Sequence, residues 1–362
     1  MNRPVCFRLG IIIIISCNFL LSHAQIKIPR EPSPGGTVSQ IVGISTIEVN
    51  YSRPSVKGRE VWGKLVPYGW NKQAFELNNE TPWRAGANEN TVLHLSHDAT
   101  VEGVQVPAGD YGLFFVINKD NSGEVILSKD SRSWGSFFYV QEHDQMRAKI
   151  TIRDNTNYTE RLSYTFDSVS KNMAELDLNW EKKQFPVKIE FAVDAIFEKY
   201  AMEVLKGEPG FSWQNNDMAA NYALANKVYI DQGIKWADRA ILETTSIAPS
   251  LTKAKLLELQ GKHDEAKKAT TAALNNAGNV DLNAYGYELL GQRNFDKAIE
   301  VFKINTQKNS DDPNVWDSLG EGYALAGDKK NAIASFKKSL SMHPNEATKT
   351  NSEKYLKQLG AM

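Results

Sequence analysis

Two segments in the first half of the sequence concentrate side chains that could bind a polar ligand. Residues 51–63 read YSRPSVKGREVWG, and residues 81–91 read TPWRAGANENT. A tryptophan can stack on a sugar ring, while guanidinium, amide and carboxylate groups can bond its hydroxyls or a carboxylate. The predicted ligand-binding residues are Arg53, Lys57, Arg59, Trp83, Arg84, Asn88 and Glu89.

Two other interpretations of these segments stay open. In the first, the arginines pair internally with Glu60 and Glu89, and the tryptophans fill the end of a β-sandwich. In the second, the chain is an enzyme acting on carbohydrate or cell-wall material. Glu89 would then be its acid/base, with Asp98 or Asp110 as an uncertain second carboxylate.

Standard catalytic and metal-binding motifs are missing from the sequence. It contains no HExxH, GxSxG or GxxxxGK motif. Residues 118–123 begin like a calcium loop, but Lys129 stands where a bidentate glutamate is needed, so we predict a hairpin turn. His94 and His97 have an odd spacing that places them on opposite faces of a strand. We therefore assign no catalytic residue, metal ligand or cofactor.

Composition limits the class of partner. The 362 residues carry a net charge of −1 and are 41% hydrophobic, which is enough for about two domains. A nucleic-acid-binding protein normally shows a basic stripe, so we expect no nucleic-acid partner. After the N-terminus, no segment is long and apolar enough to span a membrane.

The N-terminus resembles an export signal. Arg3 and Arg8 precede an apolar run over residues 9–21, and residues 22–24 offer a cleavage site before Gln25. Residues 1–24 are therefore predicted to be a signal peptide of an exported, periplasmic or extracellular bacterial protein. The alternative is a lipoprotein anchored at Cys17. Both cysteines, Cys6 and Cys17, precede the cleavage site, so the mature chain would have no disulfide.

An extended leader, residues 25–36, should lead into a β-rich domain at 37–193. Short apolar or alternating runs separated by turns predict an antiparallel β-sandwich or barrel-like domain. The predicted strands are 44–51, 91–95, 101–106, 111–117, 125–128, 149–153, 162–166, 174–180 and 185–193. Residues 194–210 are predicted to be a linker helix.

The second half of the chain has a helical period. Residues 312–344 place Gly320, Ala332 and Phe336 at the offsets of the tetratricopeptide repeat, which stacks helix pairs. Three weaker copies precede this unit, so we predict an α-helical solenoid of four helix pairs over 211–348 and a cap helix at 349–362. The inner faces of the first helices should form a groove for a protein or peptide. Its predicted residues are Tyr222, Asn226, Lys255, Glu258, Asn283, Tyr287, Asn314, Asp317 and Glu321.

Several motifs of the first half occur together. YSRPSVKGREVWGKLVPYG, TPWRAGANENT and VPAGDYGLFFV, followed by Trp134-Gly135 and a late strand ending near Trp180, resemble the bacterial family known as domain of unknown function 2911. The resemblance covers residues 39–193 and implies an exported β-rich domain, sometimes followed by helical repeats. It implies no substrate. The expected function is that of an exported binding or scaffold protein with a small polar ligand and a protein partner.

Overall fold

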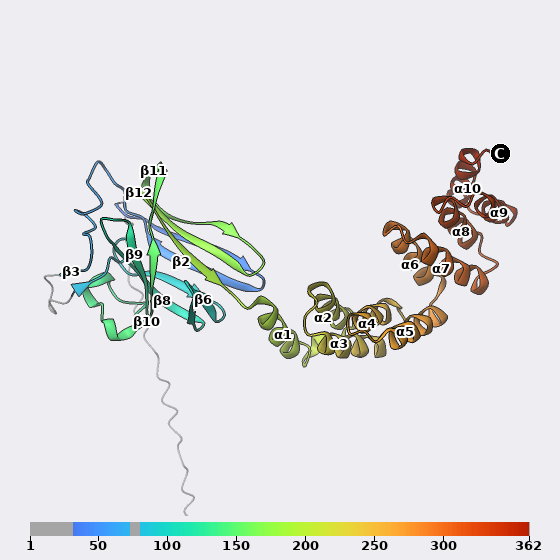
Figure 1. Cartoon of the computed structure of the whole chain (residues 1–362), viewed down its shortest axis with the longest axis horizontal. Coiled ribbons are helices and arrows are strands. Elements are labelled where there is room, and N and C mark those ends of the chain that lie inside the picture. Colours follow the sequence, from blue (N-terminus) through green and yellow to red (C-terminus); the bar gives the residue numbers. More distant parts are fainter. Residues whose placement is uncertain (1–31, 73–79, 362) are drawn as a thin grey trace, which may run out of the picture. The chain divides into compact units, whose positions relative to one another are not determined.

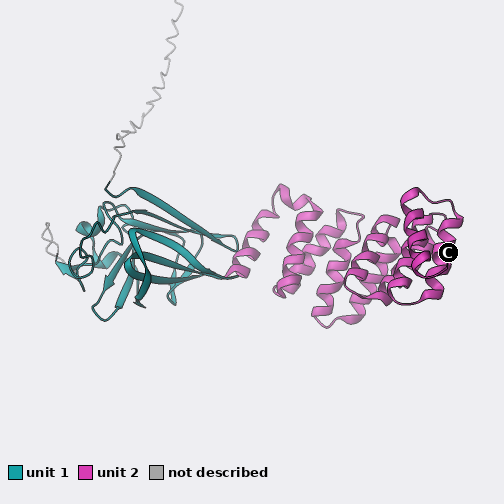
Figure 2. Cartoon of the chain, turned by 90° about the horizontal axis from the view of Figure 1, so that it is seen from above, with its two compact units in different colours: residues 1–191 teal, residues 192–362 magenta. Residues whose placement is uncertain are grey.

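The computed structural model describes residues 32–72 and 80–361. The predicted signal peptide and most of the predicted leader lie outside these residues. The chain divides into two compact units, one ending at Phe191 and the other beginning at Ala192 (Figure 2). The N-terminal unit holds antiparallel sheets and the C-terminal unit holds helices (Figure 1), as the sequence predicted.

The N-terminal unit, here the β domain, contains two main sheets. The larger has the order β1-β2-β5-β8-β9-β10, and the smaller has the order β11-β12-β6-β7. Strands of the larger sheet are β1 (Gly35–Val42), β2 (Ser45–Ser52), β5 (Thr91–Leu95), β8 (Gly109–Ile117), β9 (Ser122–Ser128) and β10 (Asp144–Thr151). Strands of the smaller sheet are β6 (Ala99–Val101), β7 (Val104–Val106), β11 (Arg153–Val169) and β12 (Met173–Glu190). A two-stranded ribbon joins β3 (Asn71–Lys72) to β4 (Glu80–Thr81).

Alternating side chains explain how the two sheets enclose a core. In β2, Ile47 and Val49 are buried, while Glu48 and Asn50 point to the outer face. The rings of Phe115 on β8 and Phe185 on β12 lie 5.1 Å apart, which joins the inner faces of the two sheets. Because neither sheet closes on itself, the domain is sandwich-like and not a barrel.

Several strands differ from the sequence prediction. The predicted strand 149–153 covers the end of β10 and the start of β11, and β3 and β4 were not predicted. β1 was missed because its sequence, GGTVSQIV, is polar and begins with two glycines. The predicted strand 101–106 is a hairpin, since Glu102 and Gly103 adopt φ values of 46° and 83° and turn the chain between β6 and β7. The two strands predicted at 174–180 and 185–193 form one strand, β12, in which Glu181 has a φ of 54°.

The C-terminal unit, here the repeat unit, is made of helix pairs. Between residues 192 and 361 the structure has ten α-helices. They are α1 (Val193–Val204), α2 (Trp213–Asn226), α3 (Ile230–Leu242), α4 (Ala248–Leu259), α5 (His263–Asn276), α6 (Asn279–Gly291), α7 (Phe295–Lys308), α8 (Pro313–Leu325), α9 (Lys329–Ser341) and α10 (Glu346–Gln358). None of these described helices is both long and apolar enough to cross a membrane.

The predicted repeat residues form the contacts within each pair. Phe302 of α7 and Phe336 of α9 are fully buried. A Cβ atom on Gly320 of α8 would come within 2.7 Å of the Phe336 ring, and Gly286 of α6 faces Phe302 in the same way. Glycine is therefore required where each first helix meets the phenylalanine of its partner. These repeated contacts confirm the predicted tetratricopeptide arrangement.

Candidate functional site

The two predicted segments of the β domain meet at one cavity of about 550 Å³. This volume falls in the usual range for small-molecule sites. Five of the seven predicted residues line it: Lys57, Arg59, Trp83, Arg84 and Asn88. The remaining two, Arg53 and Glu89, are not among the described lining residues. The nearby Lys64, Asn71, Ser136 and Trp180 also contribute to the wall.

Backbone pairing fixes the segment that contains Lys57 and Arg59. The N–H of Val56 donates to the carbonyl of Glu160 at 2.8 Å, which attaches the segment to β11. Farther along, the N–H of Val66 donates to the carbonyl of Val61 at 2.8 Å and closes a short loop. Main-chain bonds therefore attach the segment to the smaller sheet and close its loop.

The second segment is attached to the larger sheet. Trp83 and Phe115 exchange two backbone hydrogen bonds, at 2.8 and 2.9 Å, and so continue the pairing of β8 beyond the end of β5. The ring of Trp83 stacks on that of Trp180 with centroids 5.8 Å apart and an interplanar angle of 16°. Trp62 meets both rings edge-on, at 5.8 and 5.9 Å. The aromatic groups therefore form a rigid wall shared by the core and the cavity.

Arg84 has a specific environment next to this wall. Its Nη1 donates to the carbonyl of Asn88 at 2.6 Å, and its guanidinium lies 5.0 Å from the centre of the Phe137 ring. Gly135, with a φ of 62°, packs directly against the guanidinium and leaves no space there for a Cβ atom. Burial lowers the pKa of Arg84, because desolvation disfavours the charged form.

The residues outside the cavity have structural contacts. Nε of Arg53 donates to the carbonyl of Leu162 at 3.0 Å and so joins its loop to β11. Asp98, considered as a second carboxylate for Glu89, accepts the backbone N–H of Ala108 at 2.8 Å. Asp110 contacts His94 at 2.6 Å on the outer face of the larger sheet. The cavity lining thus contains none of the three carboxylates considered for catalysis.

The histidines and the calcium-like segment take ordinary structural positions. His97 contacts Ser96 through Nδ1 at 3.0 Å, whereas His94 faces Asp110. Residues 118–123 form the turn of the β8–β9 hairpin, as predicted. Within the described ranges, no group of three His, Cys, Asp or Glu side chains could hold a metal ion.

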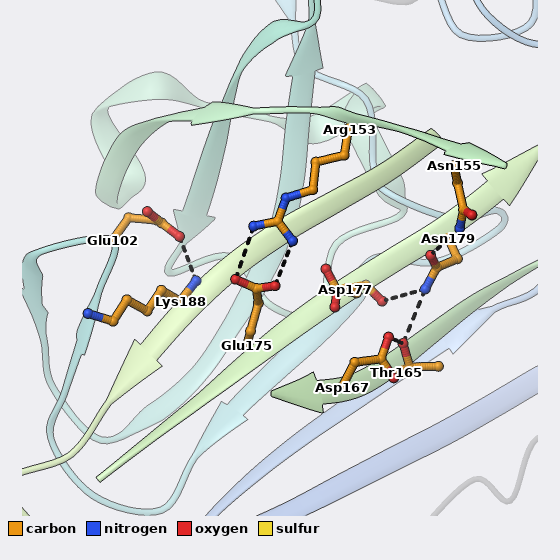
Figure 3. A network of polar contacts seen from close by, with 9 residues as sticks. All are labelled: Glu102, Arg153, Asn155, Thr165, Asp167, Glu175, Asp177, Asn179 and Lys188. Carbon is orange, nitrogen blue, oxygen red and sulfur yellow. Dashed lines mark hydrogen bonds and ion pairs between the residues drawn. The ribbon is translucent and has the colours of Figure 1, made fainter. Parts of the chain in front are cut away.

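A second polar cluster lies between the strands of the smaller sheet (Figure 3). Arg153 of β11 reaches across to Glu175 of β12, with Nη1 at 2.8 Å from Oε1. Near this pair, Asp177 is fully buried, and neither of its carboxylate oxygens accepts a hydrogen bond from the described residues. The cluster therefore contains a carboxyl group in a site unsuited to its charged form.

Several neighbours influence the Asp177 carboxyl. Its pKa is raised to about 7, mainly by burial and further by the negative charges of Glu175 and Asp167, while the positive charge of Arg153 opposes the rise only in part. Asp177 does not line the cavity. We therefore expect it to affect the stability of the β domain and not ligand binding. Its effect should appear as a dependence of stability on pH.

The nine predicted groove residues all lie on first helices of pairs: α2, α4, α6 and α8. Many of them contact the next first helix. Lys255 pairs with Glu288 at 3.3 Å, Tyr287 donates to Ser318 at 3.3 Å, and Asn351 donates to Asp317 at 2.8 Å. The partners are 31 to 34 residues apart, which is about one repeat. These bonds join successive repeats along the inner face.

The other predicted groove residues also have partners within the repeat unit or are buried. Tyr222 donates to Asp194 at 2.7 Å, Asn226 donates to the carbonyl of Tyr222, and Glu258 contacts His263. Asn314 accepts from Thr348 at 3.4 Å. Oδ1 of Asn283 is buried and accepts no hydrogen bond from the described residues. Lys255, Glu258 and Tyr287 are exposed, so Lys255 and Glu258 are the exposed charged residues among the nine.

Several lining residues were not predicted from the sequence, and Lys64 and Trp180 were missed for different reasons. Lys64 follows directly after the first motif, and extending that motif by one residue would have included it. Trp180 comes from β12, about 100 residues after Trp83, and reads as a core residue. Its sequence position gives no sign of the cavity, because only the pairing of the two sheets brings it there.

Comparison with known proteins agrees with the two-unit organisation. The family described as "Protein of unknown function (DUF2911)" matches residues 33–189. No curated protein sequence matches the chain significantly.

Solved structures similar to the helical region include YrrB, described as a TPR protein with an unusual peptide-binding site. It is 15% identical over 46% of this chain and 84% of that one, with a TM-score of 0.25. MamA from Desulfovibrio magneticus RS-1 is 12% identical over 42% of this chain and 94% of that one, with a TM-score of 0.24. The match to the DUF2911 family covers residues 33–189, which lie in the β domain, and the helix pairs of the repeat unit follow them.

Proposed function

We propose that the chain is an exported binding and scaffold protein, in which the β domain binds a small polar ligand and the repeat unit docks a protein or peptide. The observation that carries the ligand-binding part is the meeting of residues 55–67 and 81–88 at one cavity. Loops fixed by a rigid scaffold are common positions for binding residues. The aromatic wall offers a stacking surface, and Asn88, Ser136 and the cations offer polar contacts.

A thermal-shift screen of the chain from Gln25 onward, with glycans and small polar molecules, tests the ligand. A true ligand should raise the Tm of the unaltered protein and lose this effect in Trp83→Ala, because Trp83 lines the cavity. Trp134→Ala is the matched control, since Trp134 is 45% exposed and does not line the cavity. A ligand that stabilises Trp83→Ala as well as the unaltered chain contradicts this site.

The repeat unit is tested separately in the full chain. Lys255→Glu combined with Glu258→Lys reverses the two most accessible inner-face charges while keeping the net charge. Glu265→Lys combined with Lys267→Glu does the same on exposed positions of α5. Pull-down from a cell-envelope extract should lose its partner only with the first pair of substitutions. Identical partners for both pairs contradict docking on the inner face.

Export is the third part of the proposal, and it is supported by the sequence pattern of residues 1–24. Expression of the full chain in a Gram-negative bacterium, followed by mass measurement of the periplasmic product, should show a chain that begins at Gln25. A lipid-modified product beginning at Cys17 would favour the lipoprotein alternative.

A further inference from the structure

We infer that the cavity of the β domain is an oxyanion site, which takes a sugar-sized molecule bearing a carboxylate or phosphate group. This inference rests on the proposed ligand-binding function and specifies the chemical class of the ligand. It depends on three features of the cavity, namely its charge, the way its arginines are held, and its aromatic wall.

The charge of the lining is one-sided. Four cationic side chains line the cavity, and no Asp or Glu is found among the described lining residues. Like charges gathered in a concave site attract ions of the opposite sign and raise their local concentration. The four cations are Lys57, Arg59, Lys64 and Arg84.

The two arginines are positioned by neutral groups. Nε of Arg59 donates to the carbonyl of Val56 at 3.0 Å, and its Nη2 donates to the carbonyl of Ser55. Arg84 is held by the carbonyl of Asn88 and by packing against Phe137 and Gly135. A guanidinium has five N–H donors in a fixed fork. Each arginine is thus fixed in place while donors remain for a planar oxyanion.

One carboxylate lies close to the cavity cations. Glu160 accepts the backbone N–H of Lys57 at 3.0 Å, and this bond is the main cause of its lowered pKa, with Arg59 and Arg161 contributing less. It is not a lining residue. Glu160 can offset one of the four positive charges, and no Asp or Glu stands among the described lining residues, so the lining itself favours an anion.

The aromatic wall limits the shape of the ligand. Trp83 and Trp180 both line the cavity, and an indole face favours a flat or ring-shaped partner. Trp180 is only 1% exposed and its ring stacks on that of Trp83, so the partly exposed Trp83 presents the accessible face of the wall. A ring that carries an oxyanion fits this face beside the four cations.

Titration calorimetry on the full chain with four probes tests the inference. The probes are galacturonate, glucose 6-phosphate, glucose and inorganic phosphate. At least one acidic sugar should bind about tenfold or more tightly than glucose, and its affinity should fall as salt rises. A preference for galacturonate identifies a carboxylate ligand, and a preference for glucose 6-phosphate identifies a phosphate ligand.

Two substitutions connect this binding to the cavity. Arg84→Gln and Lys64→Ala should each weaken binding of the acidic sugar about tenfold or more, while Arg132→Gln, at an exposed arginine outside the lining, should not. Lys64 is exposed, so its variant should fold even if Arg84→Gln does not.

Three results would overturn the inference. Equal affinity for glucose and the acidic sugars would leave a polar-ligand site that is not an oxyanion site, and the proposed function would stand. If inorganic phosphate binds as tightly as galacturonate or glucose 6-phosphate, the sugar ring is not recognised. Failure of both acidic sugars to bind would remove the oxyanion class, and the wider ligand screen would then decide the proposed function by itself.

Discussion

The β domain gathers polar side chains at a cavity, and the repeat unit gathers them along its first helices, but the two units use them differently. On the inner face of the repeats, groups such as Asp317 and Tyr287 bond to the next repeat. In the cavity of the β domain, arginines are fixed by carbonyls and a ring, and no acidic side chain faces them among the described lining residues. Satisfied groups hold a structure together, whereas positioned but uncompensated charges are suited to binding. The β domain is therefore the better candidate for binding a small ligand.

The largest expected effect concerns the apolar packing of the repeats. Phe336→Ala should lower the free energy of unfolding by about 3–5 kcal/mol, because it leaves a cavity opposite Gly320. Urea unfolding followed by the helical circular-dichroism signal measures this loss. Phe211→Ala is the control, since Phe211 is 73% exposed, and an equal loss there would contradict the packing role of Phe336.

The next effect concerns the buried carboxyl of Asp177 in the β domain. Its folded-state pKa of about 7 lies above the ordinary value of 3.8, so the folded chain binds a proton more tightly than the unfolded chain. Stability that is present at low pH is therefore lost as the pH rises through about 7. Asp177→Asn should remove this loss and raise the free energy of unfolding by about 2–3 kcal/mol more at pH 8 than at pH 5.

Calorimetric unfolding at both pH values measures the difference for Asp177→Asn. Asp311→Asn, at an exposed position, is the control and should behave the same at pH 5 and pH 8. A gain for Asp177→Asn that does not change with pH would contradict the raised pKa.

A smaller loss of stability is expected when a hydrogen bond between successive repeats is removed. Asn351 of α10 donates to both Asp317 and Glu321, and burial raises the pKa of each carboxyl. Asn351→Ala removes these donors and should cost about 1–3 kcal/mol. Urea titration of the full chain measures this cost, with the exposed Thr350→Ala as the matched control. Equal stability of the two variants would mean that the inner-face bonds contribute little.

The smallest effect is expected in the cavity. Lys64→Ala should change the free energy of unfolding by less than about 0.5 kcal/mol in the absence of ligand, because exposed side chains without a structural contact contribute little. The same urea titration measures it. A larger loss would show that this cation is structural, and the contrast between the two surfaces would then weaken.

The sequence predicted the packing of the repeat unit more fully than the cavity of the β domain, and the reason is physical. Gly320 and Phe336 are sixteen residues apart and pack within one helix pair, so a local repeat pattern was enough to identify them. In the β domain, the cavity depends on contacts between distant strands. Lys57 and Arg84 were found because each lies in a motif with unusual chemistry, but Trp180 reaches the cavity only through the packing of two sheets.

The same distinction applies to Asp177. In the sequence ELDLNW it alternates with leucines and reads as a residue on the solvent-facing side of a strand. The side chain is instead fully buried, near the point where Arg153 at the start of β11 crosses to Glu175. No property of residues 175–180 reveals that crossing.

The sequence by itself determined the order of a β domain and a helical repeat, because alternation and the repeat period are local properties of the chain. It also determined which side chains were available for binding. Only the tertiary structure decided which of them share a cavity, since that depends on strand pairing between segments far apart in the sequence. It also decided which charges are compensated, because an ion pair forms only where folding brings its partners within about 4 Å.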